Sequence, residues 1–338
     1  MVYLVCFGIM LGMLLVAVAN EEAMDRSIIF FMVAVAIGNG GYYALGVSQN
    51  LSEAILASKI IYVIGVFAPM SVFAIICNIC KVRIPKWANM CMYTLQMVLF
   101  LFVCTIGRNT YFYKTVEFHM APSGSYLTKT YGPMHTVYLI TLMLYTIAGA
   151  MVGLISLNRK SVVSRTNVYA MVFADALAVG LYLIERVAKL EMELMPICFT
   201  ILMCIMIVPL IYIYTYSTYT YRRSFEEQLS NRGFIVVSRN LKYMGCNEYG
   251  MALFPELAEW EFGKKLPGNG GRFNTFLRQP LLNFSKLNVK NAKRRGTYEY
   301  KGEVYQYELS CLCKDGWWIQ GYIIQISNIT ELVKADNG

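Results

Sequence analysis

The sequence contains little histidine and little charge. Two of its 338 residues are histidines and 15% are charged, whereas 57% are hydrophobic and the mean hydropathy is +0.46. So apolar a chain is not typical of a soluble protein. Its length allows one bundle of membrane helices and one small domain.

The charged residues are unevenly distributed along the chain. Residues 1–221 carry 13 Lys/Arg and 9 Asp/Glu, whereas residues 222–338 carry 17 and 12. The bases of the first part flank apolar runs, where they orient helices in membranes, so the net charge of +9 does not indicate a nucleic-acid partner. We expect a boundary near Tyr221 between a membrane part and a globular domain.

The globular part lacks the cysteine and histidine patterns that bind metals. Its three cysteines, Cys246, Cys311 and Cys313, have neither CxxC spacing nor an accompanying histidine. The two histidines of the chain, His119 and His135, have no third ligand nearby in the sequence. We therefore expect no metal site and no cofactor.

Seven stretches are long and apolar enough to cross a bilayer core, which takes about 20 residues of helix. They are residues 1–19, 28–48, 55–80, 90–106, 137–157, 168–187 and 197–216. The first has the alternative interpretation of a signal peptide, because Ala17-Val18-Ala19 resembles a cleavage site. It lacks a basic n-region, however, and its removal would leave six helices and invert the topology. We therefore expect an all-α membrane bundle of seven helices over residues 1–216.

Basic residues in the short loops predict the orientation of this bundle. Most of them lie on one side, which the positive-inside rule assigns to the cytoplasm. The segment 107–136 is the longest loop of the opposite side. We expect the N-terminus outside and the C-terminal domain inside, as in a multi-pass protein of the plasma membrane. The cytoplasmic bases are Arg26, Lys81, Arg83, Lys86, Arg159, Lys160, Arg165, Arg222 and Arg223.

Residues 217–232 connect the two parts and are expected to relay the signal. Phe225 and Leu229 lie four residues apart and offer a helical contact to a partner helix. Pro209, in the seventh apolar stretch, removes a backbone N–H and provides a hinge. We expect a homodimer that forms through the seventh helix, this linker and the C-terminal domain.

Residues 233–331 are expected to form an α+β domain with a five-stranded antiparallel sheet. Strand patterns occur at 234–238, 241–246, 297–300, 303–313 and 317–329, and helical patterns at 248–254 and 274–287. Asn247 is placed to cap the first of these helices, and Asp315-Gly316 supplies a hairpin turn. Residues 332–338 begin a further linker.

This C-terminal part resembles a PAS domain. The sequence FIVVSRNLKYMGCNEYGMALF is similar to the usual opening of strand, turn, strand and Asn-led helix, and GYIIQISNITEL is similar to the closing strand that usually ends in Asp-Ile-Thr-Glu. Asn328 stands where that Asp is expected, which weakens the prediction of an intact junction to an output domain. The resemblance implies a cytoplasmic dimerising domain, with a core that we expect Phe276, Leu277, Tyr305 and Trp318 to fill in place of a cofactor.

The membrane part resembles the N-terminal seven-helix region of bacterial sensor histidine kinases and of related cyclase-type signalling proteins. The similar stretches are GGYYALGVSQNLSEAILASKIIYVIG, YGPMHTVYLITLMLYTIAGAMVGL and MELMPICFTIL. The resemblance implies a receptor for an extracytoplasmic or membrane-borne small molecule that drives a kinase or cyclase output domain or a response regulator. No phosphoacceptor histidine, GGDEF, P-loop or kinase Gly-rich sequence follows Asn328. We expect no catalytic core in this chain, which is read as the sensory region of a longer protein or as a receptor that uses a partner's output.

Polar residues in the predicted second, third and sixth helices are candidates for a ligand site. Asp175, Tyr182 and Glu185 share one face of the predicted sixth helix. Asp175 lies about a third of the way into this helix from its cytoplasmic end, and an ionisable residue at that depth of the membrane faces protein or a wet cavity. With residues at similar depth they would line a pocket open to the outside, in which Lys59 pairs with a carboxylate or binds an anionic ligand. In the alternative interpretation, Lys59 snorkels to the interface and the tyrosines form an aromatic belt. With His135, a titratable side chain at the end of the long outer loop, the full set of candidates is Tyr42, Tyr43, Lys59, Tyr62, His135, Asp175, Tyr182 and Glu185.

Two alternatives stand beside the histidine-kinase sensor. The sensory region of a diguanylate-cyclase-type protein has the same architecture, and the sequence does not separate the two. A transporter with a regulatory PAS domain would show internal repeats and paired broken helices, of which the sequence has neither. A retinal photoreceptor is excluded because residues 197–216 contain no lysine.

Overall fold

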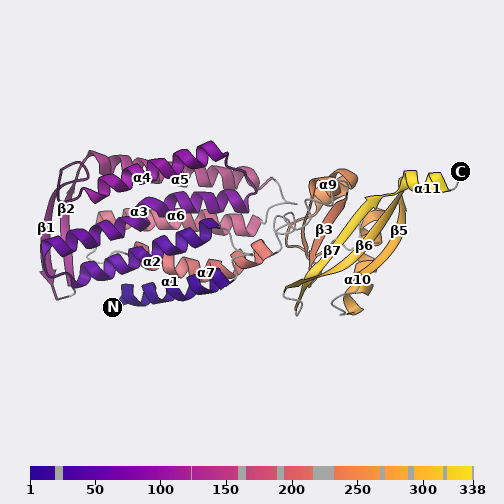
Figure 1. Cartoon of the computed structure of the whole chain (residues 1–338), viewed down its shortest axis with the longest axis horizontal. Coiled ribbons are helices and arrows are strands. Elements are labelled where there is room, and N and C mark those ends of the chain that lie inside the picture. Colours follow the sequence, from indigo (N-terminus) through magenta and orange to yellow (C-terminus); the bar gives the residue numbers. More distant parts are fainter. Residues whose placement is uncertain are drawn as a thin grey trace. The chain divides into compact units, whose positions relative to one another are not determined.

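The chain folds into two compact units (Figure 1). The computed structural model describes residues 1–19, 26–122, 124–158, 165–188, 194–215, 232–266, 271–287, 293–314 and 318–336. The first unit consists of Met1–Ile155 and Thr166–Tyr212, and the second contains the C-terminal sheet.

The first unit is a bundle of long helices. They are α1 (Val2–Ala19), α2 (Arg26–Val47), α3 (Leu51–Ile79), α4 (Lys86–Cys104), α5 (Pro133–Ser156), α6 (Arg165–Ala188) and α7 (Met195–Thr215). Each predicted apolar stretch overlaps one of them. Within the described residues, α1 to α5 are long and apolar enough to cross a membrane, and α7 contributes a shorter apolar stretch, Met195–Cys204. Several candidate membrane helices are thus present, while the count of seven crossings stays a prediction.

The packing of α2 on α3 follows from two glycines. A Cβ atom at Gly38 would collide with the Ile64 side chain, and one at Gly41 would lie 2.8 Å from the backbone nitrogen of Ile61. Only glycine lets the two helices approach this closely. The turn between them is fixed by Asn50, whose Oδ1 accepts a hydrogen bond from the Glu53 backbone N–H at 3.0 Å and so begins α3 four residues before the predicted start.

The segment 107–136, expected as a loop, contains a β-hairpin instead. Strands β1 (Tyr113–Ala121) and β2 (Gly124–Tyr131) pair in antiparallel fashion, and the hairpin lies across one end of the helical bundle (Figure 1). The two strands were not predicted because the prediction followed the polarity of the segment and not its period of two. In β1, Val116 and Phe118 are half-buried, while the intervening Glu117 is exposed.

The second unit is built around a five-stranded antiparallel sheet, as predicted. Its elements are β3 (Gly233–Ser238), β4 (Tyr243–Cys246), α9 (Glu248–Leu253), the 3-10 helix η2 (Pro255–Glu259), α10 (Gly271–Leu287), β5 (Lys293–Tyr300), β6 (Glu303–Lys314), β7 (Trp318–Asn328) and α11 (Thr330–Asp336). The strand order is β4-β3-β7-β6-β5. The predicted turn at Asp315-Gly316 lies outside the described residues.

One face of this sheet packs against the helices to form the core of the second unit. Ile235, Leu309 and Ile324 from three strands are buried together with Leu281 and Phe284 of α10. Tyr305 belongs to this core, as predicted. The side chains of Phe276, Leu277 and Trp318 lie outside the described part of the chain.

Candidate functional site

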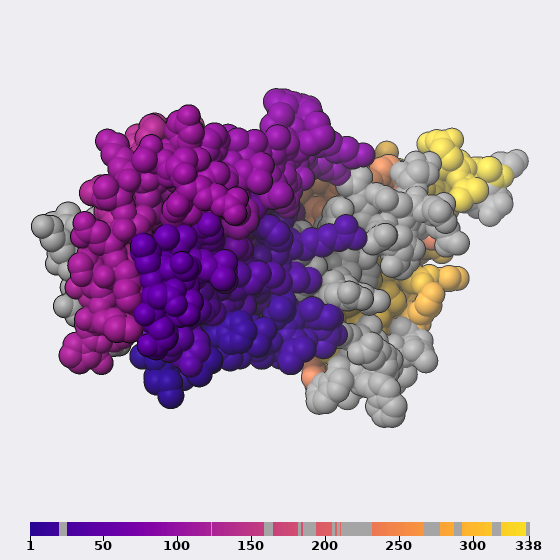
Figure 2. Space-filling model, turned by 60° about the vertical axis from the view of Figure 1, so that its left-hand side comes forward, coloured from indigo at the N-terminus to yellow at the C-terminus, as the bar shows by residue number. Residues whose placement is uncertain are grey.

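The tip of the hairpin is docked on the end of α2. The Ser125 hydroxyl donates a hydrogen bond of 2.5 Å to the backbone carbonyl of Leu45, one of the last carbonyls of the helix. Gly124 has a φ of +129°, and a Cβ atom there would lie 2.9 Å from the Gly46 carbonyl oxygen. Figure 2 shows the hairpin region, in magenta, directly beside the violet surface of the helix ends. The tip therefore caps α2.

The base of the hairpin is joined to α3 and α5 by a group of aromatic rings, here called the hairpin cluster. The Tyr113 hydroxyl of β1 donates a hydrogen bond of 2.6 Å to the Tyr62 hydroxyl of α3. His135 of α5 is 2% exposed, and its ring centroid lies 3.9 Å from that of Tyr131 in β2. The members of the cluster are Tyr62, Phe112, Tyr113, Tyr131, His135 and Tyr138.

Two glycines make room for this cluster. Gly132 sits between β2 and α5, where its N–H donates to the Phe112 carbonyl at 2.9 Å and a Cβ atom would collide with the Tyr111 carbonyl oxygen. At Gly65 of α3, a Cβ atom would lie 2.9 Å from the Tyr138 hydroxyl. The chain can enter α5 with His135 and Tyr138 facing α3 only because both side chains are absent.

Among the described side chains, one cation makes a cation–ring contact with the cluster. The Lys129 ammonium of β2 is 5.6 Å from the centroid of the Tyr113 ring, and Lys129 is half-buried opposite Val116. Tyrosine hydroxyls, an imidazole and an ammonium group are thus gathered at the point where the hairpin meets the helices. Such groups can hydrogen-bond or pair with a polar or anionic ligand if the hairpin moves.

The structure brings two of the predicted site residues together and separates the others. Tyr62 and His135 meet in the hairpin cluster, with ring centroids 6.5 Å apart. Tyr42 instead stacks on Tyr3 of α1 at 5.2 Å. Tyr43 is half-buried on α2.

The charged candidates do not form the predicted pair in the described part of the chain. Lys59 and Asp175 are both half-buried, and no ion pair joins them there. The Asp175 carboxylate faces α5, where it lies 3.9 Å from the position of a Cβ atom at Gly149. The side chains of Tyr182 and Glu185 lie outside the described part of the chain, so their role stays a prediction.

The relay residues are only partly described. Pro209 lies within α7, as expected, but its side chain is outside the described part. Phe225 and Leu229 both lie in the segment 216–231, which is outside the described residues. In the described residues, no group of three or more His, Cys, Asp and Glu side chains is placed to hold a metal ion.

Sequence reasoning missed most of the hairpin cluster. Phe112, Tyr113, Tyr131 and Tyr138 were not among the candidates, nor was Lys129. The signal was present in the density of aromatic residues in YFYK and in YGPMHTVY, at the two ends of the segment taken for a loop. Aromatic rings at both ends of a polar segment indicate that its ends are buried together.

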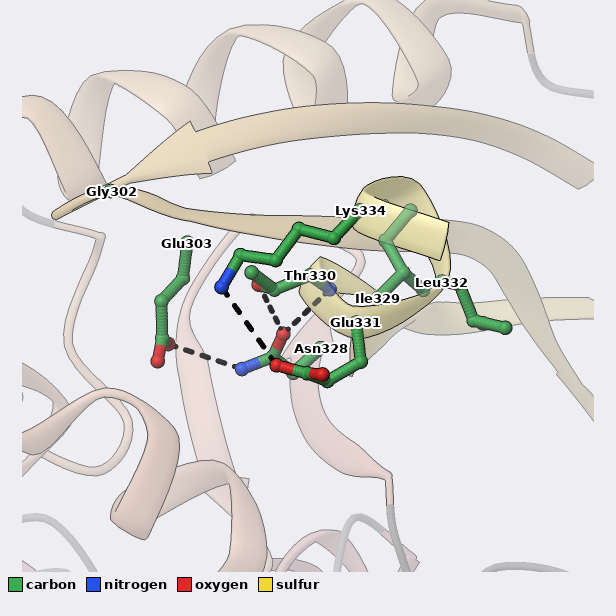
Figure 3. Close-up of a pocket in the computed structure, with 8 residues that line it drawn as sticks. All are labelled: Gly302, Glu303, Asn328, Ile329, Thr330, Glu331, Leu332 and Lys334. Atoms are coloured by element: carbon green, nitrogen blue, oxygen red, sulfur yellow. Dashed lines mark hydrogen bonds and ion pairs between the residues drawn. The ribbon is translucent and has the colours of Figure 1, made fainter. Parts of the chain in front are cut away.

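A second polar site lies at the start of α11 in the C-terminal unit (Figure 3). The side-chain oxygen of Asn328 accepts hydrogen bonds from the Thr330 N–H at 3.0 Å and the Thr330 hydroxyl at 2.6 Å, while its amide donates to Glu303 at 3.1 Å. The Val304 N–H donates to the Thr330 hydroxyl at 2.9 Å. These bonds clamp the first turn of α11 to the start of β6, beside a shallow groove of about 250 Å³.

This junction is connected to the core of its unit. The buried Tyr305 donates its hydroxyl to Glu303, and burial together with this bond raises the pKa of Tyr305. Tyr300, the last residue of β5, and Lys301, in the turn before β6, both donate to Glu256 of η2. Burial of Glu256 favours its neutral form, but these hydrogen bonds outweigh burial and lower the pKa of Glu256.

Comparison with known proteins identifies the first unit. A family model described as the N-terminal 7TM region of histidine kinase matches residues 2–218, close to two thirds of the chain. No curated protein matches the chain. Together with the apolar helices α1 to α5, the family match makes this a multi-pass membrane protein.

Proposed function

We propose that this chain, which belongs to the family of N-terminal seven-transmembrane regions of histidine kinases, is the sensory part of a two-component signalling receptor. Its seven helices cross the plasma membrane, with the N-terminus outside and the C-terminal unit in the cytoplasm. The clustering of Lys and Arg on one side of the predicted bundle supports this orientation. It puts the hairpin of β1 and β2 on the extracytoplasmic side.

The observation that carries the proposal is the attachment of one hairpin to three helices. Ser125 holds α2, Tyr113 holds α3 through Tyr62, and Tyr131 contacts His135 of α5. A small molecule that binds between the hairpin and the helices changes these three attachments at once. Because a ligand shifts an equilibrium only by its differential affinity for two states, attachments that differ between the states are what a sensor requires.

The C-terminal unit is proposed to be a PAS-like domain that dimerises and passes the signal to an output domain. Three observations support this assignment: the five-stranded sheet, the cap by Asn247, whose Oδ1 accepts from the Gly250 N–H at 2.9 Å, and the closing strand that leads into α11. Residues 217–232 would transmit a shift of α7 to this domain. A kinase output fits the family of the membrane part, and a cyclase output would use the same junction at α11.

The proposal is tested by thermal-shift screening of the full chain in nanodiscs against pools of small molecules. A true ligand raises the melting temperature of the wild type. Each of the two single variants, Tyr62→Phe and Lys129→Gln, is expected to reduce or abolish this rise. Thr128→Ala, an exposed position of β2, is the matched control and keeps the shift. A shift that survives both cluster variants would show that the ligand binds elsewhere, and the absence of any shift would contradict a small-molecule sensor.

A further inference from the structure

Asn39 is a fully buried polar residue in the middle of α2. Its side chain is 0% exposed, and its amide donates hydrogen bonds to the Val35 carbonyl of its own helix at 3.0 Å and to the Thr200 hydroxyl of α7 at 3.1 Å. Thr200 is 2% exposed and donates its hydroxyl to the Pro196 carbonyl at 2.8 Å. A direct side-chain hydrogen bond therefore joins α2 to α7.

The two helices also touch through aromatic rings near this bond. Phe31 of α2 and Phe199 of α7 meet edge to face, with centroids 5.8 Å apart and an interplanar angle of 88°. On the α3 side, Gly38 and Gly41 fix α2 by close backbone approach, as described above. A close glycine contact leaves little freedom to move, whereas a single hydrogen bond between side chains can exchange partners.

The hydrogen bonding of Asn39 is incomplete. Its Oδ1 atom is buried and has no hydrogen-bond partner among the described residues. A buried acceptor without a donor is unfavourable, so a second arrangement that satisfies it is accessible in energy. The Thr200 hydroxyl can supply the donor, because rotation about its Cβ–Oγ1 bond turns the hydroxyl hydrogen away from the Pro196 carbonyl and toward Oδ1 of Asn39.

We propose that Asn39 and Thr200 form a latch that sets the rotational position of α7 against α2, and that the latch exchanges hydrogen-bond partners when the receptor changes state. In the arrangement seen here, the Asn39 amide donates and the Thr200 hydroxyl accepts. In the other arrangement, the hydroxyl donates to Oδ1 and α7 turns with it. The inference rests on the proposed function, since it supplies a path from the sensing hairpin to the helix that leads to the C-terminal unit.

The position of the latch along α2 supports this path. Asn39 lies six residues before Leu45, whose carbonyl accepts from the hairpin at Ser125. Six residues of α-helix span roughly 9 Å. A shift of α2, together with α3, that the hairpin imposes thus reaches the latch within the same helical segment.

The latch is tested by amide hydrogen exchange of the full chain in nanodiscs, with Asn39→Leu, Thr200→Val and the double variant. Side-chain hydrogen bonds between membrane helices contribute coupling that corresponds on average to about a 3-fold change in an equilibrium constant. Each single variant is expected to raise exchange of the α7 amides around residue 200 by about 3-fold or more, and the double variant by no more than the stronger single one. Thr200→Ser keeps the hydroxyl and serves as the matched control with wild-type exchange.

Independent, multiplying effects of the two substitutions would overturn the proposal, and so would wild-type exchange in Thr200→Val. If Asn39→Leu prevents folding, the proposal is still tested by comparing amide exchange in Thr200→Val with that in Thr200→Ser. The readout requires neither a ligand nor an output domain. A failure of the sensory proposal is therefore distinguishable from a failure of the latch.

Discussion

Replacement of Asn328 by Asp restores the residue that the closing strand of a PAS-like domain usually carries, yet we expect it to loosen the junction in this chain. The Asn328 amide lies 3.1 Å from a carboxylate oxygen of Glu303 and donates to it. Asn328→Asp replaces this donor by a second carboxylate. Two unit charges about 4 Å apart repel by about 1 kcal/mol in water and by about 4 kcal/mol near a protein surface. Because both residues are exposed, the lower end applies, and loss of the hydrogen bond brings the expected cost to about 1–2 kcal/mol.

The assay is amide exchange at Ile329 and Thr330, whose N–H groups are bonded to Val304 and Asn328. A cost of this size lowers their protection about 5- to 30-fold near pH 7. The repulsion requires both carboxylates to be ionised, so the loss of protection is expected near neutral pH and not in acid, where the carboxyl groups are protonated. Adding Glu303→Gln removes the repulsion, and Glu331→Gln is an exposed control. Protection in Asn328→Asp that is unchanged, or that falls equally at low and neutral pH, would refute the reasoning.

Three further predictions concern packing, a buried hydrogen bond and pH. Gly132→Ala forces a collision with a backbone carbonyl and is expected to lower the free energy of unfolding by about 2–3 kcal/mol. Gly12→Ala, with open space around its Cβ atom, is the control and is expected to change it by no more than about 0.5 kcal/mol. Thermal unfolding in nanodiscs measures both. Tyr62→Phe removes the buried hydroxyl pair and is expected to lower stability by about 0.5–1.5 kcal/mol in the same assay, while Tyr43→Phe leaves it unchanged. The pKa of Glu256 is lowered in the folded protein, so its contribution to the free energy of unfolding is present above its unfolded pKa and is lost as the pH falls through its folded pKa. The free energy of unfolding of Glu256→Gln, measured against pH, is expected to lack this dependence. An equal pH dependence in the wild type and the variant would contradict the prediction.

The helices and the sheet were predictable because their patterns are strong and local. Long apolar runs located each helix of the first unit to within a few residues. In the second unit, alternation located the strands, and Asn247 identified the start of α9 because an N-cap acts only on its own first turn. The start of α3 was missed because Asn50 caps it from a segment that is polar and was assigned to the turn.

The candidate site was predictable only in part, because it depends on contacts between distant segments. Tyr62 was chosen for its polarity and its depth in a helix, and His135 as a titratable side chain at the end of the outer loop, and they do meet. Gly65 and Gly132 make room for the cluster in which they meet, and the effect of each glycine depends on the group opposite it, the Tyr138 side chain at Gly65 and a backbone carbonyl at Gly132. The pairing of Lys59 with Asp175 or Glu185 was one of two interpretations and was inferred from charge and similar depth, which do not specify which helix faces which.

The positions of the hairpin contacts and of Asn39 give α2 a particular role in the bundle. Glycines fix one face of α2 to α3, so the two helices move together. The hairpin holds the end of α2 at Leu45, and Asn39 holds α7 at Thr200. A helix that is rigidly packed on one side and hydrogen-bonded to exchangeable partners on the other can transfer a displacement without unfolding. In the latch that we propose, the seventh helix needs no contact of its own with a ligand, because the orientation of Asn39 sets its position.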